Sequence, residues 1–125
     1  MTNDYTLQEK MELVNTIYRQ IFISATHQQA MSWGLHSLKG IDFMGMVTLS
    51  FKVNGFIFKG EVLISYNNGL DLYEIRFRKD NTITKTICEV YCDMLGEILD
   101  REIEIGDMSL SEYQSKVEDF LTNSL

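Results

Sequence analysis

The first part of the chain carries the hydrophobic pattern of an amphipathic helix. From Leu7 onward, apolar side chains recur every three or four positions, so they form one stripe along a helix. Thr6 and Glu9 have the spacing of a capping box, in which each side chain accepts a hydrogen bond from the other residue's backbone N–H. We therefore expect a helix that begins after Thr6 and ends between residues 22 and 30. The predicted stripe consists of Leu7, Met11, Val14, Tyr18, Ile21, Phe22 and Ala25.

Residues 46–79 carry a different pattern, in which apolar and polar side chains alternate as in strands with one buried face. Asn54-Gly55 and Asn68-Gly69 are each suited to the two positive φ angles of a type I′ turn. We therefore predict an antiparallel meander of three strands joined by two-residue loops. In this register the large apolar side chains share one face, and a slip of one residue would scatter them. The side chains predicted on this face include Phe51, Phe58, Val62 and Ile75.

Residues 31–45 fit two interpretations. Met31, Trp33 and Leu35 alternate with small or polar residues, as in a short strand. A second helix that ends at Gly34 fits the same segment. Both alternatives stay open, so the predicted sheet has three or four strands.

Two further helices are predicted in the C-terminal third. Thr86 and Glu89 form a second capping-box pattern, ahead of apolar residues with helical spacing between residues 87 and 98. A last helix is expected after Gly106, with an apolar stripe over residues 110–121. The elements together predict one α+β domain over residues 1–125. Its fold is an antiparallel three- to four-stranded meander, with the N-terminal helix and two C-terminal helices packed on one face.

Few residues suit catalysis or metal binding. The sequence has no glycine-rich phosphate loop, no serine nucleophile elbow and no His-Glu-x-x-His motif. The two histidines and two cysteines lack a recognisable ligand spacing. Cys88 and Cys92 are expected to be buried, reduced thiols on one helical face. We therefore expect no catalytic residue, no metal site and no cofactor, and a small enzyme with an unrecognised site is kept as an alternative.

No apolar run is long enough to cross a membrane. The first residues contain neither the basic nor the apolar region of a signal peptide. These features predict a soluble, cytoplasmic protein.

Charge is sorted along the chain. The net charge is −7, but residues 39–85 carry seven basic and five acidic side chains, a net of +2, while residues 86–125 carry two basic and ten acidic ones, a net of −8. The predicted register places four cations on the sheet face opposite the core, with one pair, Lys59 and Arg78, directly opposed. These four candidate residues for an anion or an acidic partner are Lys52, Lys59, Arg76 and Arg78.

The predicted basic face has three interpretations. Its cations are solvated surface charges, or they meet an acidic patch of this chain or of a second copy, or they contact a nucleic-acid backbone. The net charge of −7 disfavours nucleic acid, because it repels a polyanion at long range.

Four carboxylates recur at three- and four-residue steps along the solvent side of the second-to-last predicted helix. A solvated helix face is the ordinary interpretation of this pattern. The alternatives are a site for a hard cation such as Mg²⁺ or Ca²⁺, and mimicry of DNA phosphates by an acidic inhibitor. The candidate residues of this acidic face are Asp93, Glu97, Asp100 and Glu104.

The block VNGFIFKGEVLISYNNGLDLYEIRF, followed by EVYCDMLGEILD, resembles a group of short uncharacterised proteins from gut bacteria and their phages or mobile elements. The shared features are the strands, the turns and the acidic helix, over roughly residues 46–105. The resemblance implies an accessory role in a phage or mobile element, and it carries no functional residue onto this chain.

The absence of catalytic and metal-binding motifs, together with the separation of basic and acidic segments, favours one class of function. We expect a non-enzymatic binding or accessory module that acts through a protein partner or through self-association. A homodimer fits because no proline blocks the outermost strands.

Overall fold

Helix α1 spans Leu7–Ser24 and begins where the capping box predicts. Thr6 Oγ1 accepts a hydrogen bond from the Glu9 backbone N–H at 3.2 Å, and Glu9 Oε1 accepts one from the Thr6 N–H at 3.0 Å. The predicted stripe is buried only toward the C-terminal end of the helix, because Leu7 and Met11 are 75% and 55% exposed. The first half of α1 therefore presents apolar side chains to solvent.

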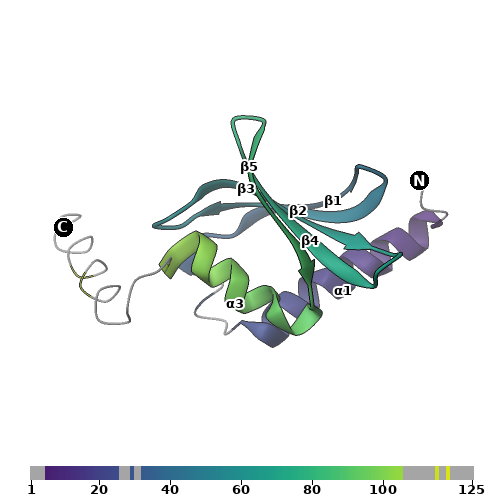
Figure 1. Ribbon diagram of the computed structural model, residues 1–125, viewed down its shortest axis with the longest axis horizontal. Helices are drawn as coiled ribbons and strands as arrows, with labels where there is room; N and C mark the ends of the chain where they lie inside the picture. The colour runs from purple at the N-terminus through teal and green to yellow at the C-terminus, as the bar shows by residue number, and fades with distance from the viewer. Residues whose placement is uncertain (1–4, 26–28, 30–31, 106–114, 116–117, 119–125) are drawn as a thin grey trace.

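The computed structural model describes residues 5–25, 29, 32–105, 115 and 118, which form an α+β fold. One antiparallel sheet has the strand order β1-β2-β3-β4-β5, so each strand pairs with the next along the chain (Figure 1). The predicted three- to four-stranded meander is thus a five-stranded one. The strands are β1 His36–Phe43, β2 Met46–Asn54, β3 Lys59–Asn67, β4 Leu72–Lys79 and β5 Thr82–Val90.

The additional strands lie at the two edges of the sheet. β1 occupies most of the segment for which strand and helix were both open. β5 continues through Val90, so the helix predicted from the second capping-box pattern is wrong for this segment. Thr86 pairs with Arg76 of β4 instead of capping a helix. Cys88 and Cys92 are exposed, which corrects the prediction that both are buried.

Both predicted hairpin registers are wrong, but by even numbers of residues. A two-residue loop at Asn54-Gly55 would pair Phe51 with Phe58, but Phe51 pairs with Val62. The β3–β4 pairing is shifted by two residues from the one that a loop at Asn68-Gly69 would give. An even shift leaves each side chain on its predicted face, because side chains alternate with a period of two. The predicted apolar face is therefore confirmed: Phe51, Val62 and Ile75 belong to the core, and Phe58 packs against it.

Tertiary contacts account for the longer β2–β3 loop. The backbone N–H groups of Ile57 and Phe58 both donate to the Ile103 carbonyl, at 2.9 and 3.2 Å. Gly55 lies so close that a Cβ added to it would be 2.3 Å from the same oxygen. The loop is thus closed by the C-terminal helical segment rather than by a two-residue turn.

The two-residue loops occur elsewhere in the meander. Met44 and Gly45, with φ angles of 52° and 78°, join β1 to β2. Asp80 and Asn81, with φ angles of 52° and 65°, join β4 to β5. Two consecutive positive φ angles are those of a type I′ hairpin, and Asp and Asn tolerate them better than most residues do.

The C-terminal helical segment consists of η1 (Cys92–Met94), α3 (Leu95–Asp100) and η2 (Arg101–Ile105). In Figure 1 it lies on the same side of the sheet as α1. Gly96 permits a close crossing, since a Cβ there would be 2.4 Å from the backbone nitrogen of Ala25. The last helix predicted, over residues 110–121, lies outside the described residues. No helix in the described ranges is long and apolar enough to span a membrane.

Trp33 links the segment before β1 to helix α3 and to the end of strand β2. Its side chain is inaccessible to solvent, and its Nε1–H donates to Asp100 Oδ1 of α3 at 2.9 Å. Its carbonyl accepts a hydrogen bond from the Asn54 N–H at the end of β2, at 2.7 Å. The strand predicted from Met31 therefore begins only at His36, after Trp33 has turned into the core.

Candidate functional site

The candidate site surrounds the edge strand β1 and extends onto the polar face, by which we mean the side of the sheet opposite the helices. The register places two rows of side chains across this face. One row contains His36, Lys52, Glu61 and Arg78, and the next contains Lys39, Ser50, Leu63 and Arg76. Arg78 faces Glu61, so the predicted opposition of Arg78 and Lys59 is wrong. Lys59 pairs with Asn54 instead.

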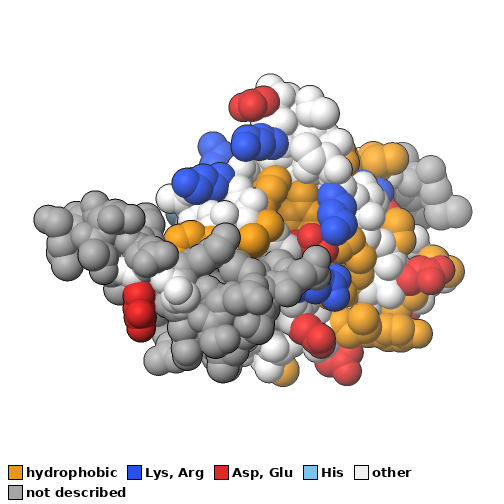
Figure 2. Space-filling model, turned by 60° about the vertical axis from the view of Figure 1, so that its left-hand side comes forward, with side chains coloured by type: hydrophobic (Ala, Val, Ile, Leu, Met, Phe, Trp, Pro, Cys, Tyr) orange, Lys and Arg blue, Asp and Glu red, His pale blue; other side chains and the backbone are white. Residues whose placement is uncertain are grey.

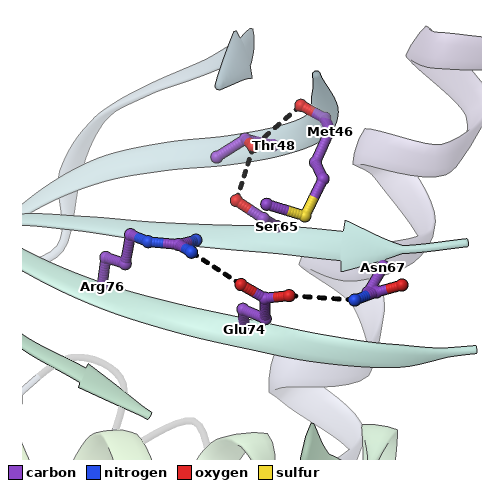
Figure 3. A network of polar contacts seen from close by, with 6 residues as sticks. All are labelled: Met46, Thr48, Ser65, Asn67, Glu74 and Arg76. Carbon is purple, nitrogen blue, oxygen red and sulfur yellow. Dashed lines mark hydrogen bonds and ion pairs between the residues drawn. The ribbon is translucent and has the colours of Figure 1, made fainter. Parts of the chain in front are cut away.

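The centre of the polar face is filled by a hydrogen-bonded network (Figure 3). Glu74 accepts from Arg76 Nη2 at 2.6 Å through one carboxylate oxygen, and from Asn67 Nδ2 at 3.0 Å through the other. The hydroxyls of Thr48 and Ser65 lie 2.7 Å apart, and both residues are fully buried. The small side chains of Thr48 on β2 and Ser65 on β3 leave room for larger groups of the network beside them.

Arg76 is one of the larger groups in this network. Its guanidinium carbon lies 5.4 Å from the centroid of the Phe43 ring, which is a cation–π contact. The residue is only 8% exposed. Arg76 therefore has a structural role here, which corrects its place among the exposed cations. Its Nη1 has no hydrogen-bond partner within the described part of the chain.

A basic pocket opens beside this network, toward the end of β2. Its volume is about 490 Å³. The pocket is lined by Lys52 and Arg78, which were both predicted on this face but not as neighbours, and it adds His36 and Lys39, which the sequence left unassigned. Lys59 is exposed and does not line it. The lining residues are His36, Lys39, Lys52, Val53, Gly60, Glu61, Arg78, Asp80 and Asn81.

Glu61 neutralises Arg78 but not the two lysines of the basic pocket. Its carboxylate accepts hydrogen bonds from Ser50 Oγ at 2.6 Å and from Arg78 Nε at 2.7 Å. Burial raises the pKa of Glu61, but the hydrogen bonds from Ser50 and Arg78 and the charges of Arg78 and Lys39 outweigh it, so the pKa lies below its ordinary value. In the described ranges, Lys39 and Lys52 have no ion pair.

Figure 2 shows the same sorting of charge over the surface. Several Lys and Arg side chains gather at the upper left of that view, and most of the Asp and Glu side chains visible there lie below them. The pocket itself carries three cationic side chains, Lys39, Lys52 and Arg78, against the two carboxylates of Glu61 and Asp80. A chain with a net charge of −7 thus keeps a small cationic surplus here.

An apolar groove lies on the helix side of β1, between this strand and the first half of α1. We call it the edge groove. It consists of two adjoining cavities of about 390 and 290 Å³. Lys10 Nζ of α1 lies 2.9 Å from Asp42 Oδ2 of β1, which ties the helix to the strand. Lys39 lines both the edge groove and the basic pocket. Apolar residues of the groove include Leu7, Met11, Val14, Tyr18, Leu38 and Ile41.

The predicted acidic face does not exist as one surface. Asp93 and Glu97 are exposed, but Asp100 and Glu104 are 6% and 4% exposed. Asp100 accepts hydrogen bonds from Trp33 and Gln29, and Glu104 accepts one from the Phe56 N–H at 3.2 Å. Two of the four carboxylates are thus engaged inside the fold, which weakens both the DNA-mimic and the cation-site hypotheses. Across the described ranges, no group of three or more His, Cys, Asp or Glu residues is placed to hold a metal.

No family model matches the chain, and comparisons with curated proteins and with solved structures likewise find no match. Function is therefore inferred from the geometry of the site itself. Sequence reasoning missed the contribution of β1, because its bulge between His36 and Lys39 interrupts the alternation that would reveal a strand. The Met44-Gly45 dipeptide could have revealed β1, because its glycine marks a turn directly before β2.

Proposed function

We propose that this protein is a non-enzymatic binding module that holds an extended segment of a protein partner along the free edge of β1. One observation carries the proposal. β1 is an edge strand with an apolar groove on one side and a basic pocket on the other, and Lys39 lines both. An edge strand offers unpaired backbone groups to which another strand can add.

The chemistry of the two sides specifies the partner segment. Successive side chains of an added strand point to opposite faces of the sheet. Those on the helix side would meet Leu38, Met11 and Tyr18, and those on the polar side would meet Lys39 and Lys52. The matching segment therefore alternates apolar and acidic residues.

A nucleic acid fits this surface less well. Arg76 and Arg78 are already paired with Glu74 and Glu61, so few cations are left for phosphates. Phe43, the aromatic residue in contact with Arg76, is half-buried and offers little ring surface on which bases could stack. The net charge of −7 also opposes a polyanion.

Fluorescence polarisation with a labelled peptide of alternating Leu and Glu tests the proposal. We expect the peptide to bind with an affinity that falls as salt rises, and a peptide of alternating Leu and Lys not to bind. The double substitution Lys39→Glu with Lys52→Glu should abolish binding, because it reverses both unpaired charges. Lys59→Glu is the matched control, since Lys59 is exposed and lies outside the pocket.

Three results would count against the proposal. The first is equal binding of the Glu and Lys peptides, and the second is equal loss of binding in the double variant and the Lys59→Glu control. The third is tight binding of a single-stranded oligonucleotide without binding of the peptide, which would favour the nucleic-acid alternative. A dimer found by sedimentation that the double variant dissociates would identify a second copy as the occupant of the edge.

A further inference from the structure

A second pocket lies at the other end of the β3–β4 pair, away from the basic pocket. Its volume is about 460 Å³, and it is placed between the end of β3, the start of β4 and η1. We call it the tyrosine pocket. None of its lining residues belongs to the edge groove or to the basic pocket. The lining residues are Gln20, Tyr66, Leu70, Asp71, Leu72, Tyr73, Tyr91 and Cys92.

Hydrogen bonds hold two of its aromatic rings in place. The Tyr66 hydroxyl donates to Asp71 Oδ1 at 2.5 Å, and the Tyr73 hydroxyl donates to Gln20 Oε1. The two rings have centroids 5.7 Å apart and planes inclined at 59°. Their hydroxyls are therefore engaged, while Tyr91 remains 59% exposed. The pocket offers a ligand aromatic rings more than free phenol groups.

The electrostatics of the tyrosine pocket favour a positive charge. Asp71 is a carboxylate in the lining, and the described residues place no Lys, Arg or His there. The pKa of Tyr66 is raised to about 12, mainly by its hydrogen bond to Asp71 and next by burial. The pKa of Tyr73 is also raised to about 12, mainly by burial. Both phenols thus stay neutral at ordinary pH. Aromatic faces carry negative electrostatic potential, which adds to the field of the carboxylate.

We propose that the tyrosine pocket binds a small alkylammonium cation. Rings of Tyr66, Tyr73 and Tyr91 would contact its methyl groups, and Asp71 would supply the opposite charge. Such a cation is attracted to aromatic faces and is weakly hydrated, so its transfer from water into the pocket costs little hydration free energy. A metal ion fits less well, because it needs several oxygen ligands, and of the described residues that line the pocket Asp71 alone carries a carboxylate.

Choline is the test ligand, and NMR titration of the full chain is the measurement. The control ligand is 3,3-dimethylbutan-1-ol, which has the shape of choline but no charge. We expect choline to shift the amide signals of residues 66–73 and 91–92, and the neutral analogue to have little effect. Tyr91→Leu should weaken choline binding by about three- to tenfold, whereas Tyr91→Phe, which keeps the ring, should not.

Asp71→Asn tests the charge at little cost to the fold. Asp71 has a φ angle of 55°, which Asn also tolerates, so the backbone should be retained. We expect Asp71→Asn to weaken choline binding and to leave any binding of the neutral alcohol unchanged. A peptide that carries one trimethyl-lysine tests whether the natural cation belongs to a protein or to a small molecule. Tighter binding of the peptide than of choline would indicate a methylated protein, and weaker binding would indicate a small molecule.

Several outcomes would overturn the proposal. Equal binding of choline and the neutral alcohol would make this an ordinary apolar pocket. Choline binding that survives both Tyr91→Leu and Asp71→Asn would place the cation elsewhere. No shift with either choline or the trimethyl-lysine peptide would remove the site. The edge proposal would stand in each case, since the two sites share no residue.

Discussion

Gly96 provides the most direct test of how the two helical segments pack. A Cβ added at this position would lie 2.4 Å from the Ala25 nitrogen, 2.5 Å from the Ser24 carbonyl carbon and 2.6 Å from the Ala25 Cβ. Non-bonded heavy atoms prefer about 3.5–4.0 Å, so Gly96→Ala requires the segments to separate by roughly 1 Å. The Gly96 N–H also donates to Ser24 Oγ at 2.8 Å, and separation would weaken this bond.

The sign of the effect distinguishes packing from helix propensity. Ala is preferred over Gly in a helix by up to about 1 kcal/mol, so without a clash Gly96→Ala would stabilise the protein. Overpacking costs about 1–3 kcal/mol, and loss of the hydrogen bond costs about 0.5–1.5 kcal/mol. We therefore expect the free energy of unfolding to fall by about 0.5–3.5 kcal/mol in total.

Urea denaturation followed by the fluorescence of Trp33, the single and fully buried tryptophan, measures this change. The matched control is Gly69→Ala. Gly69 is exposed, and its φ lies outside the left-handed region. Among the described residues, its added Cβ would meet only Asn67 Oδ1 within 4 Å, at 3.5 Å. The control should change stability by less than about 0.5 kcal/mol. If Gly96→Ala is as stable as the wild type or more so, the close crossing of α1 and α3 is wrong.

Three other predictions concern single polar groups. The pKa of Glu61 is lower in the folded chain than its ordinary value of 4.5. The ionised carboxylate therefore stabilises the fold above pH 4.5, and this stabilisation is lost as the pH falls through the folded-state pKa. In acid denaturation, Glu61→Gln should make stability depend less on pH over this range. Asp100→Ala leaves the buried Trp33 N–H without its acceptor and should cost about 1–3 kcal/mol, whereas Glu97→Ala, on the exposed side of α3, should cost almost nothing. The pKa of Tyr66 is raised from 10.0 to about 12, so above pH 10.0 the unfolded chain ionises first and stability should fall until about pH 12. Tyr66→Phe should reduce this fall, and the late phenolate absorbance should drop by the share of Tyr66 alone, because the pKa of Tyr73 is also raised to about 12.

The helix start and the sorting of strand side chains could be predicted because both depend on local properties. The capping box at Thr6 and Glu9 uses contacts three residues apart. The alternation around Phe51 and Val62 assigns each side chain to a face whatever its partner is, because any even shift preserves it. Burial of the apolar face then follows from the hydrophobic effect.

The candidate site could be predicted only in part. Lys52 and Arg78 were placed correctly on the polar face, since their position depends on parity alone. Arg76 has the same parity, but Glu74, two residues before it on β4, and Phe43 of β1 engage it. The contact with Phe43 depends on which residues become neighbours across four strands. Lys39 was missed because the bulge in β1 breaks the alternation.

Tertiary structure decided the loops, the register and the fate of the acidic residues. Asn54-Gly55 suits a two-residue turn, yet hydrogen bonds from the loop to Ile103 outweigh that local preference. Residues 86–90 have helical spacing, but pairing with the edge of β4 satisfies their backbone groups in a strand. The buried position of Asp100 is stabilised by a hydrogen bond from the Trp33 Nε1–H, which lies far away in the sequence. Local patterns set which way each side chain points, whereas long-range hydrogen bonds and packing set which residues meet, and those partners are not encoded within a few residues of each position.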